Sequence, residues 1–221
     1  MSEGTTAAGR RPLTRERVLR AALTVADEGG LGALTMRRVG QVLGVEAMSL
    51  YKHVANKDDI LDGLLELVVA DIELPAPGEP WRPAQRRRAV SARAVFSRHP
   101  WSTTLLQSRR NPGPATLAYY DGVLGNLRGG GFPVALAAQA FAVLDAFVYG
   151  FAVQESSLPF EGPDGAAAVA GPIMALMEAG EYQHMVEFAT EHAMLPGYDF
   201  GGEFDFGLDL VLDGLARMLE G

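Results

Sequence analysis

The chain has 221 residues, of which 48% are hydrophobic, and its formal net charge is −8. This composition excludes a disordered chain, and the length suits one large domain or a small domain joined to a larger one. The absence of cysteine excludes disulfides, thiolate zinc sites and cysteine nucleophiles. The polar N-terminal segment has no apolar core of signal-peptide length, so we expect a cytoplasmic protein.

The charge is unevenly distributed along the chain. Residues 1–57 hold nine Lys/Arg and five Asp/Glu, a net charge of +4, which leaves −12 for residues 58–221. Such an asymmetry is expected when one small module contacts phosphates and the acidic remainder is repelled by nucleic acid.

Helical signals run through the whole sequence without a convincing alternating strand, which predicts an all-α fold. Thr14 can cap a first helix that Gly29-Gly30 would end, Thr35 can cap a second, a third covers about 47–53, and Asn56 can cap a fourth. The apolar positions expected to face inward are Val18, Leu19, Ala22, Val25 and Ala26, then Met36, Val39, Val42 and Leu43, then Leu50 and Val54, and finally Ile60, Leu61, Leu64, Leu65, Val68 and Ile72.

A proline-rich linker over residues 75–83 separates this module from the rest of the chain. We therefore expect a flexible arm over 1–13, a first domain over 14–74 and a second over 75–221. The helices expected in the second domain cover about 84–98, a short stretch after Ser102, 115–128, a long segment opened by Pro133, one or two segments up to about His192, and 203–219.

Residues 134–153 are apolar enough to suggest a membrane span. Asp145 lies near the middle of this segment, where a charge is costly, and no cluster of Lys/Arg or tryptophan flanks it. A buried helix of a soluble protein, packed in part against a second chain, is the favoured interpretation.

The strongest functional signal lies in residues 34–57, where two short helices flank a tight turn at Gly44-Val45-Glu46. The second helix has few acidic residues, and its polar side chains are Ser49, Tyr51, Lys52 and His53. This pattern is typical of a helix-turn-helix that places a recognition helix in the major groove of DNA. Met36 fits a core equally well, and Arg37 and Arg38 also suit a solvated face.

On these residues the chain resembles the TetR (tetracycline-repressor) family of transcriptional regulators. The matching pieces are Leu34-Thr35, Arg37, Gly44-Val45, Ser49-Leu50-Tyr51, His53-Val54, Asn56-Lys57 and Ile60-Leu61. The second domain resembles the C-terminal domain of the tetracycline-repressor branch at Arg98-His99-Pro100-Trp101, Gly131-Phe132 and residues 206–215. Together these pieces cover nearly the whole chain.

The resemblance implies a homodimer that binds a palindromic operator, with repression as the family default, and that is released by a small molecule bound in the second domain. The implied DNA contacts are Thr35, Met36 and Arg37 near the backbone and one base pair, Ala47, Met48 and Ser49 at base edges, and Tyr51, Lys52, His53 and Lys57 at phosphates. Ala47, Met48 and Lys52 depart from the tetracycline repressor, so we expect a different operator sequence.

Candidate ligand contacts are the aromatic, methionine and polar residues of the second domain. They are Phe96, His99, Trp101, Leu105, Tyr119, Tyr120, Phe141, Asp145, Tyr149, Met174 and Met177. Leu105 and Glu73 fall where the drug-binding histidines of the tetracycline repressor are expected, so the resemblance does not extend to magnesium–tetracycline, and we predict no metal and no cofactor. The implied dimer interface is Ala142, Ala146, Gly150, Leu208, Val211, Leu212 and Leu215 on two long helices.

An enzyme is the competing class. Glu181 and His184 have the Glu-x-x-His spacing of helical di-iron sites, with Glu187, Glu191 and His192 nearby. A di-iron bundle needs two such motifs, and the sequence has one; it also lacks the Gly-x-Ser-x-Gly motif of serine hydrolases. A solvated helix face is the favoured interpretation of residues 181–192, and we predict no catalytic residues.

Overall fold

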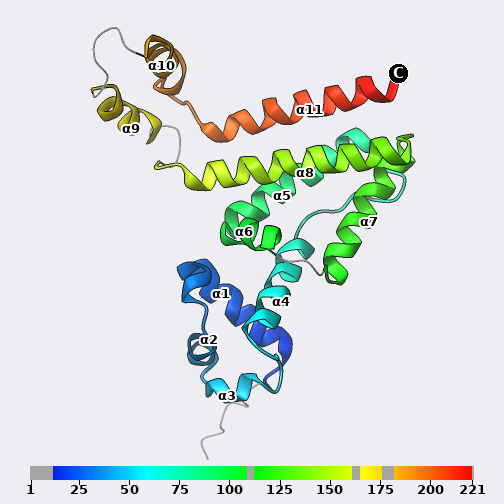
Figure 1. The fold of residues 1–221 in the computed structure, drawn as a ribbon, viewed down its shortest axis with the longest axis vertical. Coiled ribbons are helices and arrows are strands. Elements are labelled where there is room, and N and C mark those ends of the chain that lie inside the picture. Colours follow the sequence, from blue (N-terminus) through cyan, green and yellow to red (C-terminus); the bar gives the residue numbers. More distant parts are fainter. Residues whose placement is uncertain (1–11, 109–111, 161–164, 176–181, 221) are drawn as a thin grey trace, which may run out of the picture.

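This computed structural model describes residues 12–108, 112–160, 165–175 and 182–220, and within these ranges it contains helices and no strands. The predicted all-α class is confirmed. Figure 1 shows that residues 15–70 form a small head at one end, while residues 81–157 and 203–220 form a larger body.

The head begins with α1 (Arg15–Ala33), which Thr14 caps by accepting a hydrogen bond from the backbone N–H of Arg17 at 3.3 Å. The predicted stop at Gly29-Gly30 is an interruption rather than an end. Gly30 leaves the helical region, with φ 68° and ψ 178°, and a short helical stretch continues to Ala33. The predicted cap Thr35 opens α2 (Met36–Leu43) by accepting from Arg38 N at 3.1 Å.

The predicted tight turn joins α2 to α3 (Ala47–Leu50). Gly44 ends α2 with φ 65°, in the left-handed region that favours glycine. The regular part of α3 is shorter than the predicted range 47–53, and a turn continues the chain to Val54, whose N–H donates to Leu50 O at 3.0 Å. Asn56 then caps α4 (Lys57–Ala70) by accepting from Asp59 N at 2.9 Å.

The core of the head follows the predicted pattern with one error. Val18, Leu50 and Leu64 are fully buried, as expected. Val42 was predicted to face inward, but it is 45% exposed. The buried side of the short helix α2 runs through Val39 and Gly40, and a step of three residues carries Val42 past the edge of that side.

The body is built around α5 (Trp81–Arg98), α6 (Trp101–Ser108), α7 (Pro114–Gly129) and α8 (Val134–Ser157). Helix α5 starts three residues earlier than predicted, inside the proline-rich linker. Pro83 is accommodated because it occupies the first helical turn, where a missing N–H removes no helical hydrogen bond. Helix α8 packs against α5 and α7, and α11 (Glu203–Glu220) runs along α8 (Figure 1).

Helix α8 is the one helix of the described residues that is long and apolar enough to suit a membrane span. Its inward positions Ala140, Leu144 and Val148 are fully buried inside the body, as in a core helix. Its outer positions Ala142 and Ala146 are exposed on this single chain.

The remaining helices lie beyond the C-terminal end of α8 in Figure 1. They are α9 (Gly165–Met174) and α10 (Gln183–Phe188) with a π-helical turn (Ala189–Ala193). A 3-10 turn (Phe200–Gly202), whose Phe200 stacks on Phe151 of α8, leads into α11. Two arginines of α5 hold α11 to the body: Arg82 pairs with Asp213, and Arg86 pairs with Asp209 and, at 2.8 Å, with Asp205. The aspartates recur every four residues, so they share one face of α11.

Candidate DNA-contacting surface and ligand-binding core

Helix α3, with the predicted DNA-contacting residues Ala47, Met48 and Ser49, lies at the tip of the head in Figure 1. Of the predicted residues, Thr35, Arg37, Met48, Tyr51, Lys52 and Lys57 are exposed, and Met36, Ala47, Ser49 and His53 are half-buried. Met48 is 75% exposed and Tyr51 is 47% exposed, although both side chains are large and partly apolar. Residues 47–53, which we call the recognition segment, therefore offer apolar and cationic side chains to a partner.

Some of the predicted contact residues also stabilise the head. Met36 packs against the core, the structural role that the sequence favoured equally. The hydroxyl of Thr35 is engaged as the cap of α2, and Lys57 Nζ donates to Leu31 O at 3.4 Å. Arg38 lies 3.7 Å from Glu28 of α1, whereas Arg37 points its side chain into solvent.

A bidentate ion pair joins the first and fourth helices close to the end of the recognition segment. Arg15 donates from Nη1 and Nη2 to Asp59 at 2.9 and 2.6 Å, and the same carboxylate accepts from Ala55 N at 2.8 Å. The hydrogen bond from Arg15 lowers the pKa of Asp59; partial burial opposes this, and the Ala55 N–H adds to the lowering. This pair gives no local sequence signal, because its members are 44 positions apart.

Gly40 sets the spacing between α2 and the recognition segment. A Cβ atom built on Gly40 would lie 2.8 Å from Val45 O and 3.3 Å from Ala47 N. Both distances are shorter than a normal contact, so only glycine lets the two backbones approach this closely. This residue was also missed from the sequence, where it looks like one more glycine in a helix.

A buried polar cluster lies at the centre of the body. Arg88 of α5 is fully buried, and its Nη1 donates to Asp145 at 2.6 Å and to the hydroxyl of Tyr119. Tyr119 and Tyr149 donate to the two oxygens of Asp145 at 2.9 and 3.0 Å. Burial raises the pKa of both tyrosines, so the two phenols stay protonated. Burial also lowers the pKa of Arg88, but the interactions with Tyr119 and Asp145 raise it by more.

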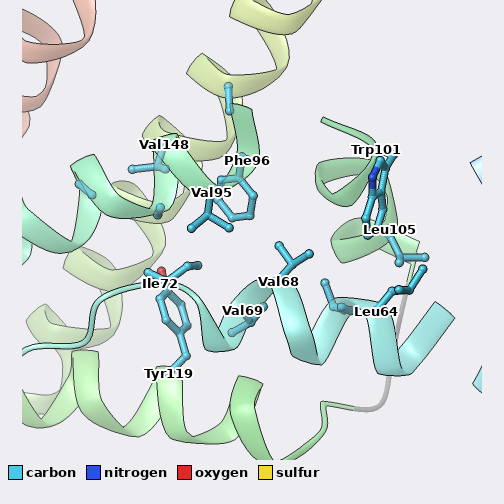
Figure 2. Close-up of a cluster of buried hydrophobic side chains, with 14 of the residues drawn as sticks. Leu64, Val68, Val69, Ile72, Val95, Phe96, Trp101, Leu105, Tyr119 and Val148 are labelled. Atoms are coloured by element: carbon cyan, nitrogen blue, oxygen red, sulfur yellow. The ribbon is translucent and has the colours of Figure 1, made fainter. Parts of the chain in front are cut away.

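Six of the predicted ligand contacts belong to this cluster or pack around it. Three are Tyr119, Asp145 and Tyr149 themselves. The rings of Phe96 and Tyr149 meet edge to face with centroids 5.2 Å apart. The ring centroid of Phe141 lies 6.4 Å from that of Tyr119 and 5.4 Å from that of Tyr120. Figure 2 shows Phe96 and Tyr119 in one apolar cluster with Val68 and Val69 of α4 and with Ile72, which lies just after that helix. The C-terminal end of α4 thus touches this core.

Two further candidates, His99 and Trp101, have their polar atoms bound to the head. His99 Nδ1 lies 2.7 Å from Asp27 Oδ1 of α1, and Trp101 Nε1 donates to the same oxygen at 2.8 Å. Leu105 is buried, and it lies close to Leu64 of α4 in Figure 2. These three residues therefore belong to the junction between head and body.

A second contact between head and body comes from Glu66 of α4. Its carboxylate accepts from the N–H of Ala115 at 2.6 Å, the N–H of Thr116 at 3.2 Å and the hydroxyl of Thr116 at 2.6 Å. Glu66 thus caps the N-terminus of α7, where the helix dipole favours a negative charge. The only sequence signal was an acidic residue within the apolar stretch of the fourth helix.

The last two candidates are not part of the cluster. Met174 lies on α9, beyond the end of α8, and Met177 lies outside the described residues. The motif proposed for the enzyme alternative falls partly outside them as well, since Glu181 is not described. Among the described residues no three His, Asp or Glu side chains gather in a metal-binding arrangement, and His192 pairs with Glu203 at 2.9 Å.

The predicted dimer-interface residues are divided between buried and exposed positions in this single chain. Leu208, Leu212 and Leu215 are buried inside this single chain, because their stripe faces its own body, and Val211 is half-buried. Ala142, Ala146 and Gly150 of α8 are exposed, as an interface requires. The exposed apolar side chains on the other side of α11 are Phe206, Leu210 and Met218. Val143 and Val153 are exposed along α8, and Val134 is exposed at its first position. We use the name outer apolar face for eight of these exposed residues: Ala142, Val143, Ala146, Gly150 and Val153 of α8, and Phe206, Leu210 and Met218 of α11.

An exposed helix-turn-helix on a small head, joined to a helical body with a buried polar core, defines a DNA-binding protein of the helix-turn-helix class. The family description "Bacterial regulatory proteins, tetR family" matches residues 18–64, and "Tetracyclin repressor-like, C-terminal domain" matches residues 74–219. The chain belongs to the TetR family of bacterial transcriptional regulators.

Two relatives are similar over nearly the whole chain. The HTH-type transcriptional repressor DrrR1 of Streptomyces coeruleorubidus is 34% identical over 96% of this chain and 83% of its own length. The TetR family protein ActR of Streptomyces coelicolor, in complex with (S)-DNPA, is 31% identical with a TM-score of 0.76 over 93% of this chain and 98% of that chain. Its complex with actinorhodin is 30% identical with a TM-score of 0.76 over 95% and 100%.

Proposed function

We propose that this chain is a repressor that binds a palindromic operator as a homodimer and is released when a small molecule occupies its body. The observation that carries the proposal is the projecting recognition segment, with Met48 and Tyr51 exposed beside Lys52. The names of the relatives support it: one is a repressor, and the other has been crystallised with small molecules.

The DNA contacts follow from the chemistry of the exposed side chains. Arg37 can reach a guanine base. A bidentate contact from its guanidinium group favours guanine over a wrong base by about 1–3 kcal/mol. Met48 can contact a thymine methyl group. Ala47 and Ser49 flank it in α3, and Thr35 and Met36 stand at the start of α2. Tyr51, Lys52, His53 and Lys57 bind phosphates, which fixes the register of the head on the duplex.

The homodimer proposed here uses the outer apolar face. Leu210 is 55% exposed and Phe206 is 67% exposed on a single chain, and a second copy would bury them against the small residues Ala142, Ala146 and Gly150 of α8. Two heads would then reach successive major grooves about 34–36 Å apart, or somewhat more. The domains proposed are an arm over 1–13, the DNA-binding domain over 14–74 and the ligand-binding and dimerisation domain over 75–221.

The ligand signal would pass through the two head–body contacts. Asp27 binds His99 and Trp101, and Glu66 holds the start of α7, while Val69 of α4 packs in the same core as Tyr119. A molecule that spreads α5, α7 and α8 must shift α4 and α1, and it thereby changes the separation of the two heads.

Selection of genomic fragments by the purified protein, followed by footprinting, tests the proposed binding to an operator. We expect the protected site to be palindromic. Arg37→Ala should weaken binding through the contact at one base position, and Lys57→Ala should reduce the slope of log affinity against log salt concentration by about 1. Arg98→Ala removes a positive charge from the body and serves as the control. A site without two half-sites, or equal losses in all three variants, contradicts the proposed docking.

Titration of the protein–operator complex with actinorhodin, the compound bound to the relative ActR, provides a first probe of release. Dissociation of the shifted band supports a ligand-responsive repressor. The genes beside the bound sites indicate further compounds to test, namely those that their products make or transport. An operator complex that none of these compounds dissociates contradicts that part of the proposal.

A further inference from the structure

Arg88 indicates what kind of molecule the body holds, if the proposed ligand-responsive function is correct. Its Nη1 is used by Asp145 and Tyr119, but Nε and Nη2 are buried and have no hydrogen-bond partner among the described residues. These two N–H groups lie along one edge of the planar guanidinium, so they point in parallel to the same place. Leaving charged donors buried and unpaired is costly, and an oxygen acceptor placed there removes the cost.

The charge of the cluster restricts that acceptor. Asp145, 2.6 Å from Arg88, already balances the buried guanidinium. A carboxylate ligand would bring a second negative charge into the same buried space, which burial disfavours. A carbonyl oxygen adds no charge, and its two lone pairs can accept from both Nε and Nη2.

The side chains around the cluster select the rest of the molecule. Phe96 meets Tyr149 edge to face and Phe141 meets Tyr120 edge to face, while Phe141 is tilted against Tyr119. Such contacts also suit the rings of a flat aromatic ligand. Tyr120 is 36% exposed while Tyr119 is 2% exposed, so this aromatic group runs from the protein surface to the buried partner of Arg88. It therefore offers a route inward.

We infer that the body binds an uncharged aromatic ketone whose carbonyl oxygen accepts hydrogen bonds from Nε and Nη2 of Arg88. None of the five surface cavities that we find in the described part of the chain is lined by Arg88. Binding therefore requires Tyr119 and Tyr120 to move aside, which displaces α7 against α4.

Three probes with one ring skeleton test this inference on the full-length protein without DNA: 9-fluorenone, fluorene and fluorene-9-carboxylate. Fluorenone can accept hydrogen bonds from the charged guanidinium group, and fluorene cannot. We therefore expect fluorenone to bind about tenfold or more tightly than fluorene in isothermal titration calorimetry. The carboxylate is expected to bind more weakly than fluorenone. Equal affinities for fluorenone and fluorene, tightest binding of the carboxylate, or no binding of any probe would overturn the inference.

Arg88→Lys keeps a positive charge beside Asp145 but removes the parallel N–H pair. We expect it to bind fluorene within about threefold of the parent affinity and to lose the preference for fluorenone. Arg93→Lys is the matched control, because Arg93 lies on the same helix but has both its Nε and Nη2 bonded to Glu155. The control should keep the full preference, and a preference that survives in Arg88→Lys overturns the assignment.

A measurement on the unaltered protein covers the case in which Arg88→Lys does not fold. The carbonyl stretching band of bound fluorenone should lie at lower frequency than in hexane, because charged N–H donors weaken the C=O bond. A band at the hexane position overturns the inference. Since no DNA is present, this result is independent of whether the operator experiment succeeds.

Discussion

At the scale of single residues, Gly40 determines whether the helix-turn-helix can close. Gly40→Ala would place a methyl group 2.8 Å from Val45 O, so α2 and the recognition segment must move apart. We expect a loss of about 1–3 kcal/mol in the free energy of unfolding, measured with urea, together with weaker operator binding. Gly32→Ala is the control, since its methyl group would meet nothing within 4 Å. Equal stability of the two variants would show that the backbones have room to separate.

Asp59 makes the stability of the head depend on pH. Its pKa is lowered in the folded state by Arg15, so the pair stabilises the fold above the unfolded pKa of about 4, and the contribution is lost as the pH falls through the lower folded pKa. Asp59→Asn should cost about 1 kcal/mol at pH 7, and the difference from the parent should shrink below about pH 4.

Glu16→Gln is the control for this measurement. Glu16 pairs with Arg20 at 3.0 Å on one turn of α1, where both side chains are 68% exposed. An exposed pair of this kind contributes well under 1 kcal/mol. A difference between Asp59→Asn and the parent that is unchanged from pH 7 to pH 3 would contradict the role assigned to the ion pair.

Residues with local partners could be predicted from the sequence, and residues with distant partners could not. Thr14, Thr35 and Asn56 cap helices that begin at the next position, so a short window contains both partners. Arg88 is 57 positions from Asp145, and nothing in its neighbourhood distinguishes it from Arg86 or Arg87. Of this cluster, the sequence therefore indicated the aromatic residues and Asp145 but missed the arginine.

At the scale of elements, Glu66 joins α4 to α7. Glu66→Ala leaves the first N–H groups of α7 without their acceptor, and we expect a loss of about 1–2 kcal/mol in the free energy of unfolding. Because α4 is also part of the head, the midpoint of any ligand-induced release should shift as well. Glu187→Ala, in the exposed α10, is the control. A stability change no larger than that of the control would remove Glu66 from the coupling route.

Element boundaries were predictable to within a few residues, but the direction in which α11 faces was not. Its apolar residues occur on more than one side, and Leu208, Leu212 and Leu215 look as suitable for a partner chain as for a core. The deciding contacts are Arg82 with Asp213 and Arg86 with Asp205 and Asp209, which turn one side of α11 toward α5. Those contacts join segments more than a hundred positions apart.

At the scale of the whole molecule, the proposed homodimer depends on the outer apolar face. Leu210→Glu would place a charge in the interface, and we expect a monomer in analytical ultracentrifugation with normal helical content. Leu117→Glu makes the same change at an exposed leucine of α7, and it should leave the dimer intact. A dimer that survives Leu210→Glu would place the interface elsewhere. This substitution is sharper than deletion of residues 203–221, which would also remove the buried Leu208 and Leu212.

The hydrogen bond from Trp101 to Asp27 gives the protein a native optical reporter. The chain has two tryptophans, Trp81 and Trp101. Trp81 packs on Phe132 within the body, with ring centroids 4.9 Å apart, whereas the indole N–H of Trp101 is bonded to α1 of the head. In a Trp81→Phe variant the remaining tryptophan fluorescence, excited at a wavelength that tyrosine does not absorb, comes from Trp101 at the head–body contact. Its emission wavelength therefore records the position of the head without an attached dye, in solution and at the speed of a stopped-flow mixer.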